Sequence, residues 1–350
     1  MSVAESGQTA SVGEPVIVVV IPSYRVRNHI LSLLARIGSE VALIFVVDDA
    51  CPDGSGAHVL AGCHDPRVTV LTHQVNQGVG GAVMTGYQRA LAAGATVVVK
   101  LDGDGQMDPA LIPQFAAPIL QGRADYVKGN RFYNIEDVRA MPMVRLVGNA
   151  GLSFMTKLSS GYWNIFDPTN GYTAISATVL SYIPMRKLKR RYFFESDLLF
   201  RLGTIQACVF DLPMTAIYAD EDSGLNVRRA FFPFLAGNIG NLCRRVFYNY
   251  FLRGFSVASL ELLVGTFSLL FGVVFGVHGW AESFATGRPA TTGTVMLAAL
   301  PVILGVQLLL SFLAFDISAV PYRVITPLLP LRRASVEPLS VVRSETRCGL

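Results

Sequence analysis

The chain has 350 residues, of which 51% are hydrophobic and only 15% are charged, and its formal net charge at pH 7 is +4. The chain has more apolar residues than one large core needs, which indicates a membrane segment. A net charge this small argues against a nucleic-acid partner. The arginines gather beside the apolar segments, where they favour contact with membrane lipids.

The cysteines argue against two further classes of protein. Their number is odd and no two form a C-x-x-C pair, which disfavours a disulfide framework and a zinc site. We therefore expect reduced thiols at all five positions, which are Cys51, Cys63, Cys208, Cys243 and Cys348.

The first 220 or so residues have the pattern of one α/β domain. Residues 1–14 lack the basic stretch of a signal peptide, and we expect them to be flexible. From residue 15 to residue 224, continuous apolar runs alternate with segments of helical spacing, which predicts a doubly wound α/β domain with a mostly parallel sheet covered on both faces. The predicted strands are 16–22, 41–49, 68–73 and 95–102, and the predicted helices include 26–37 and 78–93.

Polar side chains follow four of the predicted strands at the point where each strand ends. Tyr24 follows the first strand, Asp49 ends the second, Asn76 follows the third and Asp102 ends the fourth. In open parallel sheets, ligands bind beyond the carboxyl ends of the strands, so these side chains should share one crevice. Any one of them alone would also suit a helix cap or a turn.

The stretch VVVKLDGDGQMDP, residues 97–109, predicts a site for a metal-bridged diphosphate. Asp102, Asp104 and Gln106 are spaced two apart at a strand end, so their oxygens can converge on one hard divalent cation, Mg²⁺ or Mn²⁺. A dinucleotide site fits poorly, since Val83 stands in GVGGAV where a third glycine belongs. We therefore predict a divalent cation as the cofactor and disfavour hydride transfer.

Two carboxylates in YFFESDLLF are candidates for contact with a substrate. Glu195 and Asp197 are two apart in a segment of helical spacing, so their side chains should diverge. One of them could act as a general base for a hydroxyl acceptor. With a phosphate acceptor, which is already an anion, both would instead orient the sugar or an arginine.

The residues before the apolar segments predict contact with a membrane surface. Residues 225–254 mix bulky aromatic residues with arginines, which is typical of amphipathic helices in the interface. Arg228 and Arg229 could pair with the phosphate of a lipid acceptor, or with headgroups in general.

Two long apolar segments predict a membrane hairpin over residues 255–316. The segments 255–277 and 295–315 are each about long enough to cross a hydrocarbon core of roughly 30 Å, although a pair of core helices is the alternative. Arginines precede the first segment and follow the second, whereas the loop between them has one. The positive-inside rule therefore places both chain ends, including a basic tail over 317–350, on the cytoplasmic side of the inner membrane. Glu261, in the first segment, could reach the interface or pair within a homo-oligomer.

Several motifs carry a family resemblance over residues 15–227. VIPSYRVRNHI, VVDDACPDGSG, NQGVGGAVMTGYQRAL, KLDGDGQMDP, KGNRF, NGYTAIS, RRYFFESDLLFRL and DLPMTAIYADEDSGLN occur in the order seen in family-2 glycosyltransferases with the GT-A fold. The chain resembles in particular the polyprenyl-phosphate glycosyltransferases related to dolichol-phosphate mannose synthase, including the bacterial members with two C-terminal spans.

The resemblance implies roles for individual residues. Asp104 and Arg131 would be catalytic, and Glu195 and Asp197 would orient the sugar. The residues implied for the nucleotide sugar are Pro22, Tyr24, Asp49, Asp102, Gly103 and Asp104, those for the metal are Asp102, Asp104 and Gln106, and Arg131 is implied for the acceptor phosphate. Further predicted contacts of the acceptor phosphate are Ser223, Arg228 and Arg229. The chain departs from the family pattern after Tyr24 and in the insertion within DDACPDGS, and both departures fall at the nucleoside site.

The function implied is inverting, metal-dependent transfer of a hexose from a nucleotide diphosphate sugar to polyprenyl phosphate at the cytoplasmic face. One alternative is a membrane glycosyltransferase that acts on a lipid or polysaccharide hydroxyl. A processive synthase is disfavoured, because neither Trp163 nor Trp280 lies in a Q-x-x-R-W motif. An inactive membrane scaffold is the alternative from another class.

Overall fold

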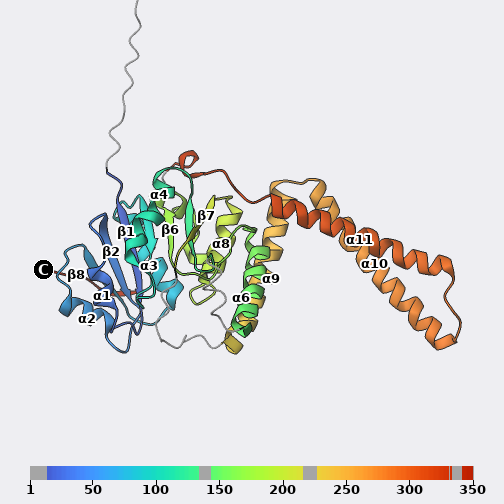
Figure 1. Ribbon diagram of the computed structural model, residues 1–350, viewed down its shortest axis with the longest axis horizontal. Coiled ribbons are helices and arrows are strands. Elements are labelled where there is room, and N and C mark those ends of the chain that lie inside the picture. Colours follow the sequence, from blue (N-terminus) through green and yellow to red (C-terminus); the bar gives the residue numbers. More distant parts are fainter. Residues whose placement is uncertain (1–13, 134–142, 216–226, 331, 333–340, 350) are drawn as a thin grey trace, which may run out of the picture.

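The computed structural model describes residues 14–133, 143–215, 227–330, 332 and 341–349, with the backbone alone described at 143–147, 149 and 227–231. A twisted eight-stranded sheet forms the centre of the globular part (Figure 1), with the strand order β7-β5-β6-β4-β1-β2-β3-β8. The strands are β1 (Ile17–Ser23), β2 (Val41–Asp48), β3 (Val68–His73), β4 (Val97–Lys100), β5 (Tyr126–Asn130), β6 (Thr173–Ser176), β7 (Val209–Pro213) and β8 (Val342–Arg347).

The sheet is mostly parallel, as predicted. Only β6 and β8 run against their neighbours, whereas β1 pairs in parallel with both β2 and β4. The long runs of valine and isoleucine explain this arrangement, because strands with both faces buried must be apolar at every position. The prediction of an α/β domain with a mostly parallel sheet is confirmed.

Helices cover both faces of the sheet and create two separate cores. Along β1, Val19 and Ile21 pack into one core with residues of α1, α2 and α4, and Val18 and Val20 pack into the other with residues of α3 and α8. The alternation follows from the two-residue period of a strand. The helices are α1 (Ile30–Ala35), α2 (Ser55–Gly62), α3 (Val79–Ala92), α4 (Ile112–Leu120), α6 (Met143–Ser160), α7 (Ala177–Leu180), α8 (Phe194–Thr204), α9 (Val227–Phe247), α10 (Val257–Thr286) and α11 (Thr292–Ser318).

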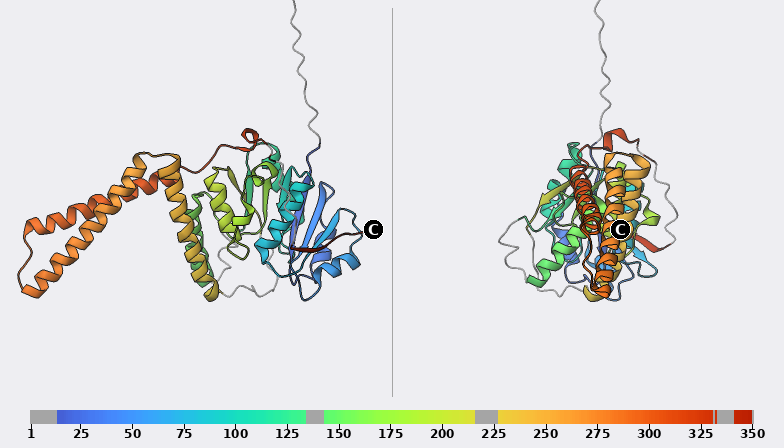
Figure 2. Two further views of the ribbon diagram at one scale, coloured as in Figure 1. Left: turned by 180° about the vertical axis from the view of Figure 1, so that it is seen from behind. Right: turned by 90° about the vertical axis from the view of Figure 1, so that its right-hand side faces the viewer.

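Beyond the sheet, α9 lies against α6 and α8, and α10 and α11 form a hairpin that projects away from the globular part (Figures 1 and 2). Helices α10 and α11 have 30 and 27 residues, and an 18-residue stretch of each has a mean hydropathy of 2.1 and 2.3, respectively, so both are long and apolar enough to cross a membrane. Most of their large apolar side chains are exposed. The alternative of buried core helices therefore does not describe this hairpin.

Small and polar residues hold the two hairpin helices together. A β-carbon on Gly272 would come within 2.7 Å of the Ala298 carbonyl oxygen, so the glycine allows the close approach of α10 to α11. Glu261 accepts a 2.8 Å hydrogen bond from Ser311 Oγ across the hairpin. This contact lies within one chain, so Glu261 needs no second copy to satisfy it.

The residues after α11 return to the globular part, which the sequence analysis did not predict. Asp125 accepts hydrogen bonds from the backbone N–H groups of Ile325 and Thr326 and from the Thr326 hydroxyl. Further on, β8 pairs antiparallel with β3 and covers the edge of the sheet. The end of the expected basic tail is therefore a strand of the sheet.

A buried carboxylate joins the hairpin to the globular part. Asp316, near the end of α11, accepts hydrogen bonds from both terminal nitrogens of Arg245 on α9, at 2.6 and 2.9 Å. The Tyr250 hydroxyl and Trp163 Nε1 donate to the same carboxylate at 2.6 and 2.8 Å. Arg245 and Asp316 are each 3% exposed, so this ion pair is withdrawn from water.

Substitution of Asp316 tests the junction. We expect Asp316→Ala to lower the melting temperature of the detergent-solubilised protein, because loss of one partner leaves the Arg245 charge buried and unpaired, at a typical cost of about 3 kcal/mol or more. The matched control is Ser318→Ala, whose exposed hydroxyl donates to the Phe315 carbonyl. Equal melting temperatures for the two variants would show that the ion pair does not hold the hairpin.

Candidate functional site

The carboxyl ends of three neighbouring strands meet at one edge of the sheet. Strand β1 lies between β4 and β2, with Ser23 paired with Asp48 and Val20 with Lys100. Pro22 and Tyr24 at the end of β1 thus lie between the acids that follow β2 and β4. Tyr24 is 44% exposed, and the Arg25 guanidinium lies over its ring, 5.5 Å from the centroid.

The turns beside Tyr24 have unusual backbone conformations. Arg25 and Ala50 have φ angles of 58° and 52°, in the left-handed region that side chains rarely adopt. The two turns also touch, since the Arg25 N–H donates to Cys51 Sγ at 3.1 Å. Such strain persists only where the surroundings fix it, and it clusters at functional sites. These turns contain the two departures from the family pattern noted in the sequence.

The Asp49 carboxylate stabilises the turn that leads into α3. Its carboxylate accepts hydrogen bonds of 2.7 Å from His73 Nδ1 and from the backbone N–H groups of Gln77 and Gly78. The residue is only 3% exposed. A direct contact of Asp49 with the nucleoside stays a prediction, and the observed contacts support the shape of the β3–α3 turn.

The segment after β4 carries the oxygens predicted to hold a metal ion. Gly103 packs against Val26, and Asp104 Oδ1 accepts a 3.0 Å hydrogen bond from the Gln106 N–H, which fixes the turn. Carboxylate and amide oxygens at a partly exposed strand end are the donors that Mg²⁺ and Mn²⁺ prefer, so Asp102, Asp104 and Gln106 fit such an ion. Within the described ranges, no group of three or more His, Cys, Asp or Glu side chains could hold a metal by itself. An ion here would therefore need amide, diphosphate or water oxygens as well.

A buried lysine links the end of β4 to helix α8. Lys100 Nζ lies 2.9 Å from Asp102 Oδ1 and 3.2 Å from Glu195 Oε1, and the lysine side chain is 1% exposed. Burial alone lowers the pKa of Lys100, but the carboxylates of Asp102 and Glu195 outweigh burial and raise that pKa above its ordinary value. Lys100 was not among the predicted site residues, although a lysine at the end of an otherwise apolar strand is a visible signal.

Glu195 and Asp197 diverge, as their spacing predicted. Glu195 faces Lys100. Asp197 is 1% exposed and packs on the buried side of α8. Its carboxylate accepts hydrogen bonds from the Lys189 N–H, from the Arg201 guanidinium and from Asn241 Nδ2 of α9. Direct contact of Asp197 with a sugar stays a prediction, and its observed partners give it a part in holding α8 to α9.

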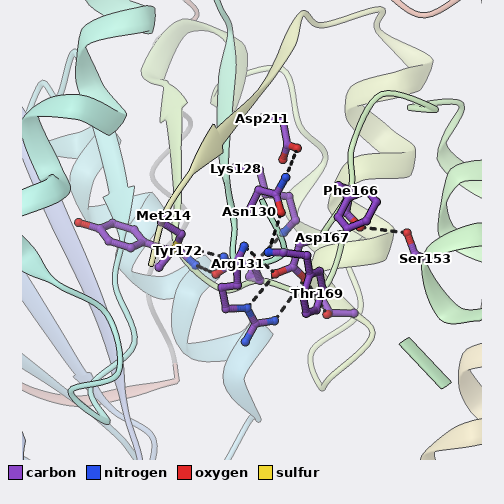
Figure 3. Close-up of polar contacts among 12 residues, drawn as sticks. Lys128, Asn130, Arg131, Ser153, Phe166, Asp167, Thr169, Tyr172, Asp211 and Met214 are labelled. Atoms are coloured by element: carbon purple, nitrogen blue, oxygen red, sulfur yellow. Dashed lines mark hydrogen bonds and ion pairs between the residues drawn. The ribbon is translucent and has the colours of Figure 1, made fainter. Parts of the chain in front are cut away.

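Arg131 follows β5 and is held by a carboxylate that the sequence analysis also missed. Arg131 Nε and Nη2 donate to the two oxygens of Asp167 at 2.8 and 3.2 Å (Figure 3), and the Asp167 side chain is fully buried. Thr169 Oγ donates to the same carboxylate. Such a bidentate pair fixes the plane of the guanidinium.

Two further buried groups lie beside this ion pair. Lys128 Nζ donates to the Asn170 carbonyl at 2.5 Å, and burial lowers the pKa of Lys128 to about 8. Asn130 Nδ2 donates to Asp211 at 2.8 Å (Figure 3), yet burial raises the pKa of Asp211 to about 6. The carboxyl end of β5 is therefore a polar cluster enclosed by the fold.

Three of the predicted acceptor residues lie outside the description. Ser223 belongs to residues 216–226, which the structure does not describe, and the side chains of Arg228 and Arg229 are not described either. Their contact with an acceptor phosphate stays a prediction.

Comparison with known proteins gives matches over the globular part. The family model described as "Glycosyl transferase family 2" matches residues 18–183. The chain is 34% identical over 167 residues, which are 47% of this chain and 66% of the other, to the UDP-N-acetylglucosamine–dolichyl-phosphate N-acetylglucosaminyltransferase of Methanococcus voltae. It is 30% identical over 223 residues, which are 61% of this chain and 83% of the other, to the polyprenol monophosphomannose synthase of Mycolicibacterium smegmatis.

One solved structure with a related arrangement is glucosyl-3-phosphoglycerate synthase from Mycobacterium tuberculosis in complex with Mn²⁺, UDP-glucose and phosphoglyceric acid. The TM-score is 0.48 and the identity 20%, with 66% of this chain and 79% of the other covered. A likeness of this size is too weak to bear on the substrate or the metal.

The raised pKa of Asp211 predicts a pH-dependent stability. Because its pKa is about 6 in the fold and 3.8 without it, the fold favours the protonated form, and this contribution to stability is lost as the pH rises from about 4 to about 6. Asp211→Asn cannot ionise, so we expect it to melt at a higher temperature than the parent at about pH 7 and to lose that advantage near pH 4. Thermal melting at both pH values measures this. The exposed Asp53→Asn is the control, and the same advantage for both variants would contradict the assignment to Asp211.

Proposed function

Because the chain belongs to glycosyl transferase family 2, we propose that it moves a hexose from a nucleotide diphosphate sugar to polyprenyl phosphate at the cytoplasmic face of a membrane. The observation that carries this proposal is the combination, in one chain, of a carboxylate-bearing strand end with an exposed apolar hairpin tied to the same domain through Arg245 and Asp316. The acceptors named for the two relatives, dolichyl phosphate and polyprenol, support a lipid phosphate.

The proposed reaction requires the site to bind two substrates that carry phosphate groups. A phosphate oxygen of the acceptor attacks the anomeric carbon from the face opposite the leaving group, the bond to the nucleoside diphosphate breaks, and the configuration inverts. A divalent cation held by Asp102, Asp104 and Gln106 would neutralise charge on the leaving diphosphate. Arg131 would stabilise phosphate charge, because Asp167 already holds its guanidinium in one orientation.

The carboxylates differ in what they offer to this reaction. A phosphate acceptor is already an anion near neutral pH, so it needs positioning more than a base. Lys100 holds one oxygen of Glu195, and within the described part of the chain the other oxygen, Oε2, has no hydrogen-bond partner. Glu195 would therefore accept a hydrogen bond from a hydroxyl of the transferred sugar.

The arginines support a membrane placement with the globular domain in the cytoplasm. They stand before α10 and after α11, which is the pattern of the positive-inside rule. Such a placement brings α9 to the membrane surface, where Arg228 and Arg229 at its start could reach an acceptor phosphate.

A transfer assay tests the proposal directly. We expect detergent-solubilised protein with Mg²⁺ or Mn²⁺ to convert polyprenyl phosphate into a glycosyl lipid with one donor from a panel of nucleotide sugars, detected by mass. Asp104→Asn should keep the fold but lose nearly all transfer, because it removes a charge that holds the cation. Near-normal turnover of this variant in the presence of EDTA would exclude the metal-dependent mechanism. Absence of both transfer and donor hydrolysis in the parent would favour an inactive scaffold.

A second comparison separates a phosphate acceptor from a hydroxyl acceptor. With both substrates saturating, Glu195→Gln should keep measurable transfer, whereas Arg131→Ala should lose about a hundredfold or more, because phosphate charge is then left unpaired. Transfer should also fall below about pH 6, where a phosphomonoester gains its second proton. If Glu195→Gln is as inactive as Asp104→Asn while it still binds both substrates, a hydroxyl acceptor that needs a base becomes the better proposal.

A further inference from the structure

The ammonium group of Lys100 is enclosed behind two carboxylates that reach the surface. Its side chain is 1% exposed, whereas the side chains of Asp102 and Glu195 are 28% and 14% exposed. The lysine itself is therefore closed to solvent, and any ligand at this edge of the sheet would meet the two carboxylates and not the cation between them.

The two carboxylates come from different parts of the chain. Asp102 follows β4 and is one of the predicted metal ligands, whereas Glu195 lies in the first turn of α8. One ammonium group within 3.2 Å of both fixes their separation and prevents the two negative charges from repelling each other.

A glycine from a third segment confirms how closely this group is packed. Gly171 precedes β6, and a β-carbon there would overlap Asp102 Oδ2 and come within 2.7 Å of Lys100 Nζ. Alanine at this position would therefore displace the carboxylate or the ammonium group. Three segments thus restrict where the Asp102 carboxylate can point.

We propose that Lys100 is a positioning residue of the donor site, which ties the diphosphate side of the site at Asp102 to the sugar side at Glu195. This proposal rests on the proposed transferase function. Lys100 does not touch the reacting atoms. It orients Asp102 Oδ1 away from the ligand and holds the Glu195 side chain so that its second oxygen is open to a sugar hydroxyl.

The alternative is a lysine that only neutralises buried charge. A purely structural role would affect stability and leave the geometry of the two carboxylates toward a ligand unchanged. The two roles separate in a measurement that compares binding of a nucleotide sugar with binding of the nucleoside diphosphate alone, because only the former contacts the sugar side.

The principal test uses Lys100→Met in the full chain, with Lys187→Met as the matched control at an exposed position. We expect faster hydrogen exchange in residues 101–107 and 194–198 of Lys100→Met alone, because two released carboxylates repel each other. With Mn²⁺ present, we expect the affinity for the nucleotide sugar to fall about tenfold more than the affinity for UDP or GDP. A loss of this size is typical when one hydrogen bond to a charged group, here Glu195, is lost. Exchange and binding equal to those of Lys187→Met would overturn the proposal.

Two further variants keep the test decisive if Lys100→Met does not fold. Gly171→Ala retains the lysine and should still speed exchange in 101–107 and weaken nucleotide-sugar binding. Adding Glu195→Gln to Lys100→Met removes one of the two charges and should restore slower exchange in 101–107. If neither effect appears, the proposal is wrong. The exchange measurements need no transfer activity, so a failure of the proposed function, seen as absence of product, is distinguishable from a failure of this inference.

Discussion

The arrangement of this protein depends on one constraint, which is that a charge withdrawn from water costs several kcal/mol unless a partner is already in position. Several charged side chains of the described residues are buried, and three of the resulting ion pairs join different parts of the chain. Arg245 with Asp316 joins the apolar hairpin to the globular part, Arg131 with Asp167 fixes a cation at the end of β5, and Lys100 lies between two carboxylates at the end of β4. Each of these contacts joins segments that lie far apart in the sequence.

Local patterns were sufficient to predict the fold class, the first four strands and the two hairpin helices. Runs such as VIVVVIP and VALIFVVDD predicted strands, because a strand buried on both faces must be apolar at every position. The two long apolar segments predicted the hairpin helices, because each is long and apolar enough to cross a membrane. The positions of Tyr24, Asp49 and Asp102 at neighbouring strand ends followed from the same periodicity. At most of these strand ends, the predicted boundary differs from the observed one by one or two residues.

The polar partners could not be predicted, because each lies far away in the sequence. Lys100 and Glu195 are 95 residues apart, Arg131 and Asp167 are 36 apart, and Arg245 and Asp316 are 71 apart. No periodicity relates such positions, and an aspartate before a proline, as at 167, also suits an ordinary turn. The return of β8 to the sheet was missed for another reason. Residues 342–347 are mostly polar, and an edge strand needs only backbone hydrogen bonds on one side.

The balance of charge at the strand ends supports the predicted cation on grounds that do not depend on the relatives. Asp102, Asp104 and Glu195 bring carboxylates to the site, where Lys100 lies between two of them, and Asp167 holds Arg131. A nucleotide diphosphate sugar and a phosphate acceptor would both add negative charge in the same place. Because such charges cannot gather at short range without compensation, binding of the two proposed substrates would call for further positive charge. A divalent cation at the predicted ligands Asp102, Asp104 and Gln106 would supply it on the donor side, and Arg228 and Arg229 at the start of α9 are the predicted source on the acceptor side.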